Sequence, residues 1–127
     1  TQAVELYIPK ERRNQFLGDR FLFKARHNRI AHLSGGELRY LEIKLILYSK
    51  APYILLDEPF NGLSPIAAEE IRMHIAESAR TRGIILTDHN FREVHKIVNR
   101  IFLLDECYLK EIHEKEELIS YGYYRPI

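Results

Sequence analysis

The sequence predicts an α/β fold with a parallel sheet, because short apolar runs alternate with segments of helical periodicity. Apolar strands are expected at residues 53–56, 84–87 and 101–104, with a helical segment between each pair. Short links between a strand, a helix and the next strand imply parallel neighbours and right-handed crossovers. We therefore expect all three strands to lie in one sheet.

A helix is predicted from about Gly35 to Lys50. Ser34 is a preferred N-cap residue, and Glu37 stands three residues further on, which is the spacing of a capping box. Pro52 ends the helix, since the residue before a proline avoids the helical region. The expected packing face carries side chains at three- and four-residue spacing: Leu38, Leu41, Leu45 and Tyr48.

A second helix is predicted to start at Pro65, with Ser64 as its N-cap, and to stop at Arg82-Gly83. Its expected packing face is formed by five residues: Ala67, Ile71, His74, Ile75 and Ser78.

The remaining elements are shorter. A capping pattern at residues 90–93 opens a helix that is expected to run through Val98. Residues 108–112 are predicted to form an edge hairpin strand, and residues 114–120 a short helix. Residues 1–32 show no clear period, and we expect short helices there.

Composition fits one globular domain or part of one. The chain has 127 residues, of which 46% are hydrophobic and 29% charged, so it can bury a core and stay soluble. No apolar run approaches the roughly 18 residues of a membrane span, and the N-terminus lacks a signal-peptide pattern. The single cysteine, Cys107, excludes an internal disulfide and fits a reducing compartment.

Charge is distributed unevenly along the chain. Residues 1–32 carry seven Lys/Arg and three acids, a net +4 within a chain whose net charge is +1. A solvated helical face or a partner surface would each explain this excess. No basic run is dense enough to indicate nucleic-acid binding.

Four motifs carry the functional signal through their order and spacing. LSGGE at 33–37 is followed by YILLDEP at 53–59, NGLSP at 61–65 and ILTDH at 85–89. This series, within about Leu33 to Glu106, resembles the nucleotide-binding domain of ABC (ATP-binding cassette) transporter ATPases. The resemblance implies a P-loop NTPase-like core.

Such a domain also needs a phosphate loop of the form G-x-x-x-x-G-K-[ST], the Walker A motif, which these residues lack. We interpret the chain as the C-terminal portion of one ABC ATPase domain. Residues 1–32 would be part of the helical subdomain that precedes the signature. Residues 33–127 would hold the signature helix and the catalytic α/β core.

Ser34, Gly35 and Gly36 are predicted to bind phosphate. The start of a helix offers unpaired backbone N–H groups and the positive end of the helix dipole, to which Ser34 adds a hydroxyl. A helix cap alone would explain these residues, but their position ahead of LLDEP favours phosphate. The resemblance implies that they and Glu37, which replaces the commoner glutamine, contact ATP held by the opposite subunit. Because an acid in the first turn suits the dipole, Gly36→Asp is expected to leave stability nearly unchanged.

Asp57 and Glu58 close an apolar strand, and successive strand residues point to opposite faces. A pair of surface acids before Pro59 is the alternative, but it would incur desolvation without benefit. The resemblance implies that Asp57 orients the water shell of Mg²⁺. It implies that Glu58 is the general base for the water that attacks the γ-phosphorus.

His89 is expected at the end of the next strand, where it resembles the switch histidine that contacts the γ-phosphate. The order Thr87-Asp88-His89-Asn90 resembles the ATPases of lipopolysaccharide-export and branched-chain amino-acid systems. Ser64 stands where the family usually has an Asp in the loop that crosses the dimer interface. It can cap a helix but supplies no charge for cross-talk between the two sites.

The resemblance implies ATP binding and hydrolysis with Mg²⁺ as the nucleotide-binding subunit of an ABC transporter. Expected partners are a second nucleotide-binding domain, in a head-to-tail dimer, and transmembrane permease subunits at the cytoplasmic face of the membrane. The 127-residue chain alone is expected to bind Mg-ATP weakly and not to hydrolyse it. Two alternatives are a soluble ABC ATPase of DNA repair, chromosome maintenance or translation, and a non-catalytic ABC-like binding half-domain.

Overall fold

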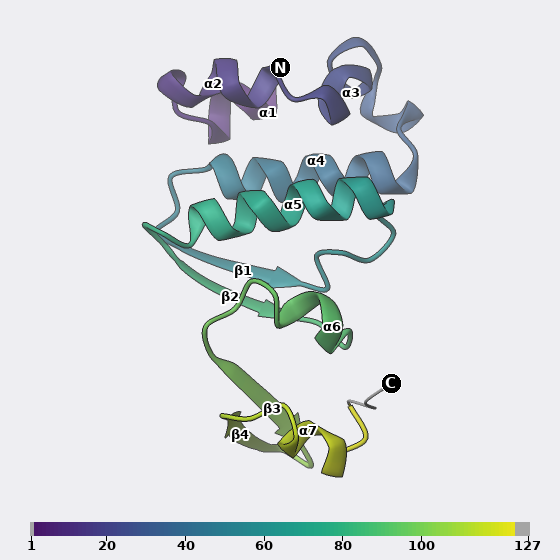
Figure 1. Cartoon of the computed structure of the whole chain (residues 1–127). Coiled ribbons are helices and arrows are strands. Elements are labelled where there is room, and N and C mark those ends of the chain that lie inside the picture. The colour runs from purple at the N-terminus through teal and green to yellow at the C-terminus, as the bar shows by residue number, and fades with distance from the viewer. Residues whose placement is uncertain (1, 124–127) are drawn as a thin grey trace. The chain divides into compact units, whose positions relative to one another are not determined.

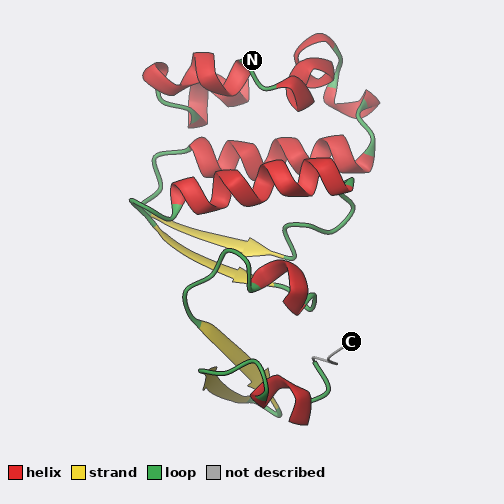
Figure 2. Ribbon diagram, viewed as in Figure 1, coloured by secondary structure: helices red, strands yellow, loops and turns green. Residues whose placement is uncertain are grey.

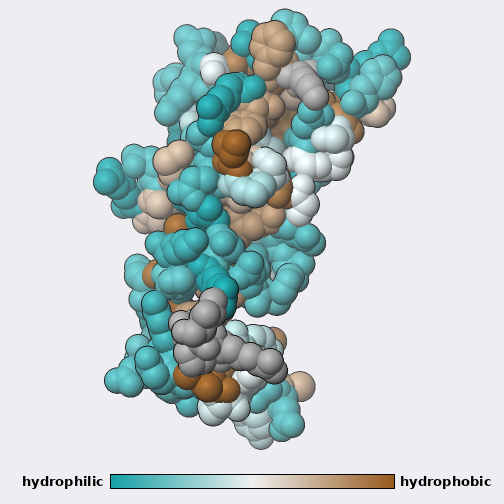
Figure 3. Space-filling view, turned by 45° about the vertical axis from the view of Figure 1, so that its right-hand side comes forward, coloured by the Kyte–Doolittle hydropathy of each residue, from teal (hydrophilic) through white to brown (hydrophobic). Residues whose placement is uncertain are grey.

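The computed structural model describes residues 2–123, which fall into two compact units that divide after Thr87 (Figure 1). Polar side chains dominate the surface seen in Figure 3, with hydrophobic ones scattered among them. Among residues 2–123, no helix is long and apolar enough to cross a membrane.

Short helices form the first 32 residues, as predicted (Figure 2). They comprise three α-helices and two 3₁₀ turns: α1 (Gln2–Tyr7), α2 (Lys10–Leu17), η1 (Arg20–Leu22), α3 (Phe23–His27) and η2 (Ile30–His32). Several arginines in this basic segment serve local structure. Arg13 donates to the carbonyl of Glu5 at 2.7 Å, and Arg20 pairs with Glu70 of another helix at 3.0 Å. Intramolecular contacts thus account for part of the basic excess, with no need of a partner protein to explain those residues.

The signature helix α4 spans Gly35–Tyr48 and begins at the predicted N-cap, Ser34. The predicted packing face is wrong apart from Tyr48, since Leu38, Leu41 and Leu45 are only half-buried. The buried stripe is instead formed by Tyr40, Ile43, Lys44, Leu47 and Tyr48. α4 contacts α1, α2, η1, α5 and β1, so its surroundings rather than its apolar periodicity decide which stripe is covered. The buried stripe includes a lysine, Lys44, so apolar spacing alone does not identify it.

Strands β1 (Tyr53–Asp57) and β2 (Gly83–Thr87) pair in parallel, in a register that runs from Tyr53↔Gly83 to Asp57↔Thr87. The crossover between them is α5 (Pro65–Ser78), which lies beside α4 in Figure 1. Only one sheet face is covered, because Ile54 and Leu56 are buried whereas Tyr53 and Leu55 are exposed. The apolar run of β1 is therefore buried on one face only.

Helix α5 begins at Pro65 behind its N-cap Ser64, as predicted, and ends at Ser78, before the predicted stop at Arg82. The predicted packing face is confirmed for all but one position: Ala67, Ile71, Ile75 and Ser78 are buried, and His74 is partly exposed.

The second unit contains α6 (Phe91–Val94), β3 (Ile101–Asp105), β4 (Tyr108–Ile112) and α7 (Glu117–Ser120). The predicted hairpin strand at residues 108–112 is confirmed as β4, which pairs with β3 in an antiparallel hairpin. The prediction that β3 joins a parallel sheet is wrong. The two loop residues, Glu106 and Cys107, have φ of 43° and 68°. Positive φ at both positions is the geometry of a type I′ turn, which favours pairing between adjacent strands.

The helices of this unit are shorter than predicted. α6 stops at Val94 rather than continuing to Val98, and its N-cap Asn90 makes no side-chain cap hydrogen bond. The small core of the unit contains three buried side chains: Leu103, Ile112 and Leu118. The last four residues of the Tyr-rich tail, 124–127, lie outside the described residues.

Candidate functional site

Three segments of the first unit meet in a shallow pocket: the start of α4, the end of β1 and the loop that leads to α5. The pocket has a volume of about 450 Å³ and is lined by Gly35, Arg39, Asp57, Glu58, Asn61 and Gly62. Gly35 and the two acids were predicted as site residues from separate motifs, and the structure brings them together. This is the carboxyl end of two parallel strands, where open α/β sheets bind ligands.

Glu58 occupies a strained backbone position at the end of β1. Its φ is 45°, in the left-handed region, which costs a non-glycine residue about 1–2 kcal/mol. Its N–H donates to the carbonyl of Thr87 at 2.8 Å, and its own carbonyl accepts from Asn61 N–H at 3.1 Å. The second bond closes a turn whose second residue is the buried Pro59. Backbone hydrogen bonds thus hold Glu58 at the sheet edge.

The two carboxylates have different surroundings. Asp57 is exposed, and its Oδ1 accepts a hydrogen bond from the hydroxyl of Thr87 on the neighbouring strand. Glu58 is half-buried, and its Oε2 lies 3.5 Å from the side-chain amide of Asn61, which donates to it. One acid is fixed by β2 and the other by the loop, which permits the two to have separate roles.

The carboxylate oxygens at this edge of the sheet could supply only some of the ligands of Mg²⁺. Mg²⁺ is usually held by one or two carboxylates, several waters and the phosphates of a substrate. Asp57 offers an exposed carboxylate of the right kind. Within residues 2–123, no group of three or more His, Cys, Asp or Glu forms a metal site. Water and phosphate oxygens would therefore have to complete the shell.

The signature turn is capped as its sequence predicts. The Ser34 Oγ accepts from Glu37 N–H at 3.2 Å, and the Ser34 N–H donates to the Glu37 carboxylate at 2.9 Å. The capping box thus uses the Ser34 hydroxyl and part of the Glu37 carboxylate. The amides of Gly35 and Gly36 lie between them in the first turn, at the positive end of α4.

The two glycines differ in the space around them. A Cβ on Gly36 would lie 2.8 Å from the carbonyl oxygen of Gly62, whereas a Cβ on Gly35 would meet nothing within 4 Å. The expectation that Gly36→Asp leaves stability nearly unchanged is therefore wrong. The helix dipole favours the charge, but a backbone oxygen occupies the space that the side chain needs.

Arg39 is a pocket residue that the motifs did not reveal. Its Nη2 donates to two successive carbonyls, that of Asp57 at 2.5 Å and that of Glu58 at 3.1 Å. The sequence held one signal for it: Arg39 stands four residues after Gly35, and residues four apart lie on the same helical face.

Sequence relatives identify the family. The chain is 37% identical over 112 residues to the lipopolysaccharide export system ATP-binding protein LptB of Acidithiobacillus ferridurans, an alignment that covers 87% of this chain and 46% of that protein. It is 33% identical over 103 residues to LptB of Escherichia coli K12, covering 79% and 42%. The chain is a homologue of ABC transporter ATP-binding proteins. It spans about half the length of these curated relatives.

Two further comparisons concern the ABC ATPase family and fold. An uncharacterized ABC transporter ATP-binding protein of Rhizobium meliloti is 36% identical over 92 residues, covering 72% of this chain and 34% of that protein. A solved structure, reported for ATP-driven dimerization and DNA-stimulated activation of SMC ATPases, matches with a TM-score of 0.57 at 16% identity. It covers 78% of this chain and 67% of that chain, and it shows the shared fold. No family model matches the chain.

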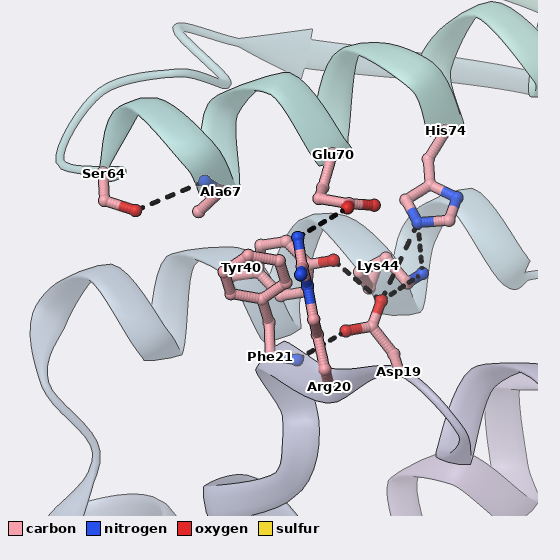
Figure 4. Close-up of polar contacts among 9 residues, drawn as sticks. All are labelled: Asp19, Arg20, Phe21, Tyr40, Lys44, Ser64, Ala67, Glu70 and His74. Atoms are coloured by element: carbon pink, nitrogen blue, oxygen red, sulfur yellow. Dashed lines mark hydrogen bonds and ion pairs between the residues drawn. The ribbon is translucent and has the colours of Figure 1, made fainter.

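Two other residues matched to ABC motifs have clear local settings. Ser64 caps α5, since its hydroxyl accepts from Ala67 N–H at 3.3 Å (Figure 4). His89 belongs to the second unit and is exposed there. Its role as the γ-phosphate switch stays a prediction.

A buried polar cluster, which we call the Asp19 cluster, lies elsewhere in this ABC homologue (Figure 4). Asp19 Oδ2 accepts from Lys44 Nζ and from the Tyr40 hydroxyl, both at 2.7 Å, and lies 3.7 Å from His74 Nε2. Asp19 Oδ1 caps η1 by accepting from Phe21 N–H at 2.8 Å. The side chains of Asp19 and Lys44 are only 8% and 1% exposed.

The protonation of the Asp19 cluster follows from its contacts. Burial alone would raise the pKa of Asp19, but its contacts with His74, Lys44 and Tyr40 outweigh burial and lower that pKa. Burial lowers the pKa of Lys44, although Asp19 opposes the shift. Burial and the bond to Asp19 raise the pKa of Tyr40 well above its ordinary value. The cluster joins η1 to α4 and α5 through a carboxylate that stays ionised.

Proposed function

We propose that the full-length protein is the nucleotide-binding subunit of an ABC transporter and hydrolyses ATP with Mg²⁺. The observation that carries the proposal is the shared pocket of Gly35, Asp57 and Glu58 in a homologue of LptB. A helix N-terminus and two carboxylates around one space support binding a triphosphate and cleaving its terminal phosphoanhydride bond. The phosphate loop would come from sequence outside these 127 residues.

The predicted site residues have separate roles in this proposal. Glu58 accepts the proton of the attacking water as general base. Asp57 binds water of the Mg²⁺ shell, and Thr87 orients its carboxylate. The amides of Gly35 and Gly36 receive a phosphate, beside the cap made by Ser34 and Glu37. His89 senses the γ-phosphate, and Ser64 holds the loop that would cross the dimer interface.

The assembly follows from the same proposal. A signature turn that serves the nucleotide of an opposite subunit requires a second nucleotide-binding domain. The relatives are export and transport ATP-binding proteins by name, which supports a transporter with permease subunits at the cytoplasmic face of the membrane. The structural likeness to an SMC ATPase is a likeness of fold and does not favour the soluble alternative.

The proposal is tested by Glu58→Gln in the full-length protein, because glutamine keeps size and hydrogen bonding but cannot act as the base. Turnover of ATP should fall about 10²- to 10⁴-fold, the usual contribution of a general base. Equilibrium binding of ATP should be retained.

Glu106→Gln is the matched control. Glu106 also follows an Asp at a strand end and has a φ of 43°, close to the 45° of Glu58. It should leave turnover unchanged. Near-normal hydrolysis by Glu58→Gln, or an equal loss in both variants, would remove Glu58 from the proposed mechanism.

A further inference from the structure

Within the first unit, α4 contacts the Asp57–Glu58 turn and the loop that follows it at two places. Gly36 packs so closely on the loop after β1 that a Cβ would stand 2.8 Å from the carbonyl oxygen of Gly62. One turn along, Arg39 Nη2 donates to the carbonyls of Asp57 and Glu58. Both contacts are made to backbone carbonyl oxygens, so they constrain the backbone of this segment rather than a side chain.

Glu58 needs such support more than other pocket residues. Its φ of 45° is unfavourable for a side chain with a Cβ, and the following Pro59 disfavours the ordinary right-handed helical region. A strained backbone persists only where its surroundings over-determine it. Three neighbours do so here: Thr87 holds the Glu58 N–H, while Asn61 and Arg39 hold its carbonyl.

We propose that Arg39 is a positioning residue that holds the Asp57–Glu58 turn in its left-handed conformation and thereby places the Glu58 carboxylate for catalysis. The inference rests on the proposed function, since it assigns Arg39 to the geometry of the proposed base. It also ties that base to α4, whose first turn carries Ser34, Gly35 and Gly36.

Two other roles for Arg39 make different predictions. Its Nη1 lies 3.8 Å from the Glu42 carboxylate, one turn further along α4. The arginine side chain is 35% exposed and that of Glu42 51%, and an exposed pair of this kind contributes little. As a direct phosphate ligand, Arg39 would act on ATP affinity instead of on turnover.

The first test compares Arg39→Met with Arg80→Met in the full-length protein. Arg80 is a matched control, because it also pairs with a glutamate three residues away, Glu77 at 3.4 Å, and is exposed. Arg39→Met should lower kcat roughly 100-fold with little change in KM, since a misplacement of about 1 Å can have that effect. Arg80→Met should change neither constant.

A double-mutant cycle asks whether Arg39 acts through Glu58. If it does, Arg39→Met causes no additional loss of turnover in a Glu58→Gln background. An additive loss, an unchanged kcat, or a raised KM at constant kcat would each overturn the positioning role. Guanidinium at low, non-denaturing concentration should partly restore kcat to Arg39→Ala.

Hydrogen exchange gives a readout that does not depend on catalysis. The amide of Glu58, bonded to the Thr87 carbonyl, and that of Asn61, bonded to the Glu58 carbonyl, should exchange faster in Arg39→Met. The amide of Gly83, bonded to Pro52 at the other end of the strand pair, should keep its protection. Unchanged exchange at Glu58 would overturn the inference even if the protein hydrolyses ATP. If the wild-type protein does not hydrolyse ATP, the proposed function fails while exchange still decides the role of Arg39.

Discussion

Gly35 and Gly36 are neighbours in one helical turn, yet the structure predicts opposite responses to the same substitution. In Gly36→Ala, the new Cβ would meet the Gly62 carbonyl oxygen at 2.8 Å, so the backbone must shift. We expect a loss of about 1–3 kcal/mol in the free energy of unfolding, as for other overpacked sites. Gly35→Ala should be neutral or slightly stabilising, because its Cβ meets nothing within 4 Å and alanine favours the helix. Urea unfolding of both variants measures the difference, and equal stabilities would contradict the close approach of Gly36.

Gly35→Asp separates phosphate binding from helix capping. The added carboxylate fits sterically at the pocket wall and suits the helix dipole, so stability should hold. In the full-length protein, ATP-driven dimerization and hydrolysis should be lost, because like charges would meet in a closed site. A folded and fully active Gly35→Asp variant would reduce the signature turn to a helix cap.

Single residues were predictable where a local pattern marks them. Asp57 and Glu58 stand out because two acids close an apolar strand, and Gly35 because it follows an N-cap. Arg39 and Thr87 were missed because their partners are far away in the sequence. One binds backbone carbonyls, which no motif encodes, and the other binds across a strand pair.

Among the elements, the Asp19 cluster is a buried polar link between the N-cap of η1 and helices α4 and α5 (Figure 4). Asp19→Asn would leave Lys44 buried without a counter-charge. We expect a loss of about 3–5 kcal/mol in the free energy of unfolding, which is typical when one partner of a buried pair is removed. Asp105→Asn, at an exposed strand end, is the matched control and should change little.

The Asp19→Asn variant also tests the pH dependence of stability. Folding lowers the pKa of Asp19, so its contribution is complete above the unfolded-state pKa of about 3.9 and is lost as the pH falls below that value. Wild-type stability should therefore fall in this acid range, and Asp19→Asn should show a shallower fall. Urea unfolding of both proteins at a series of pH values measures this difference. Parallel acid limbs in wild type and Asp19→Asn would show that the cluster does not carry this dependence.

Element starts were predicted better than element ends and partners. Ser34 and Ser64 mark the first turns of α4 and α5 by local capping, which a short window of sequence contains. The hairpin strand at residues 108–112 was predicted correctly, but the expectation that β3 also joins the parallel sheet was wrong, because in the structure β3 pairs with β4 alone. The buried stripe of α4 was mispredicted because it includes Lys44, whose charge is matched by a distant Asp19.

At the scale of the whole molecule, the fold class was predictable and the extent of the sheet was not. β1 and β2 form the predicted parallel pair, while the strands of residues 88–127 make a hairpin of their own. Alternating strands and helices indicate a parallel sheet, but they do not say how many strands join it. The chain also spans only about half of its LptB relatives, so the complete catalytic unit is a matter for the full-length protein.

The most direct test of the central claim is the mass of the full-length Glu58→Gln variant, measured by light scattering after size exclusion with Mg-ATP and with Mg-ADP. The account predicts a doubled mass with Mg-ATP only, because binding persists and cleavage no longer releases the dimer. Wild type should return to its starting mass as ATP is consumed. A Glu58→Gln protein that keeps one mass in both nucleotides and hydrolyses ATP at a near-normal rate would contradict the account.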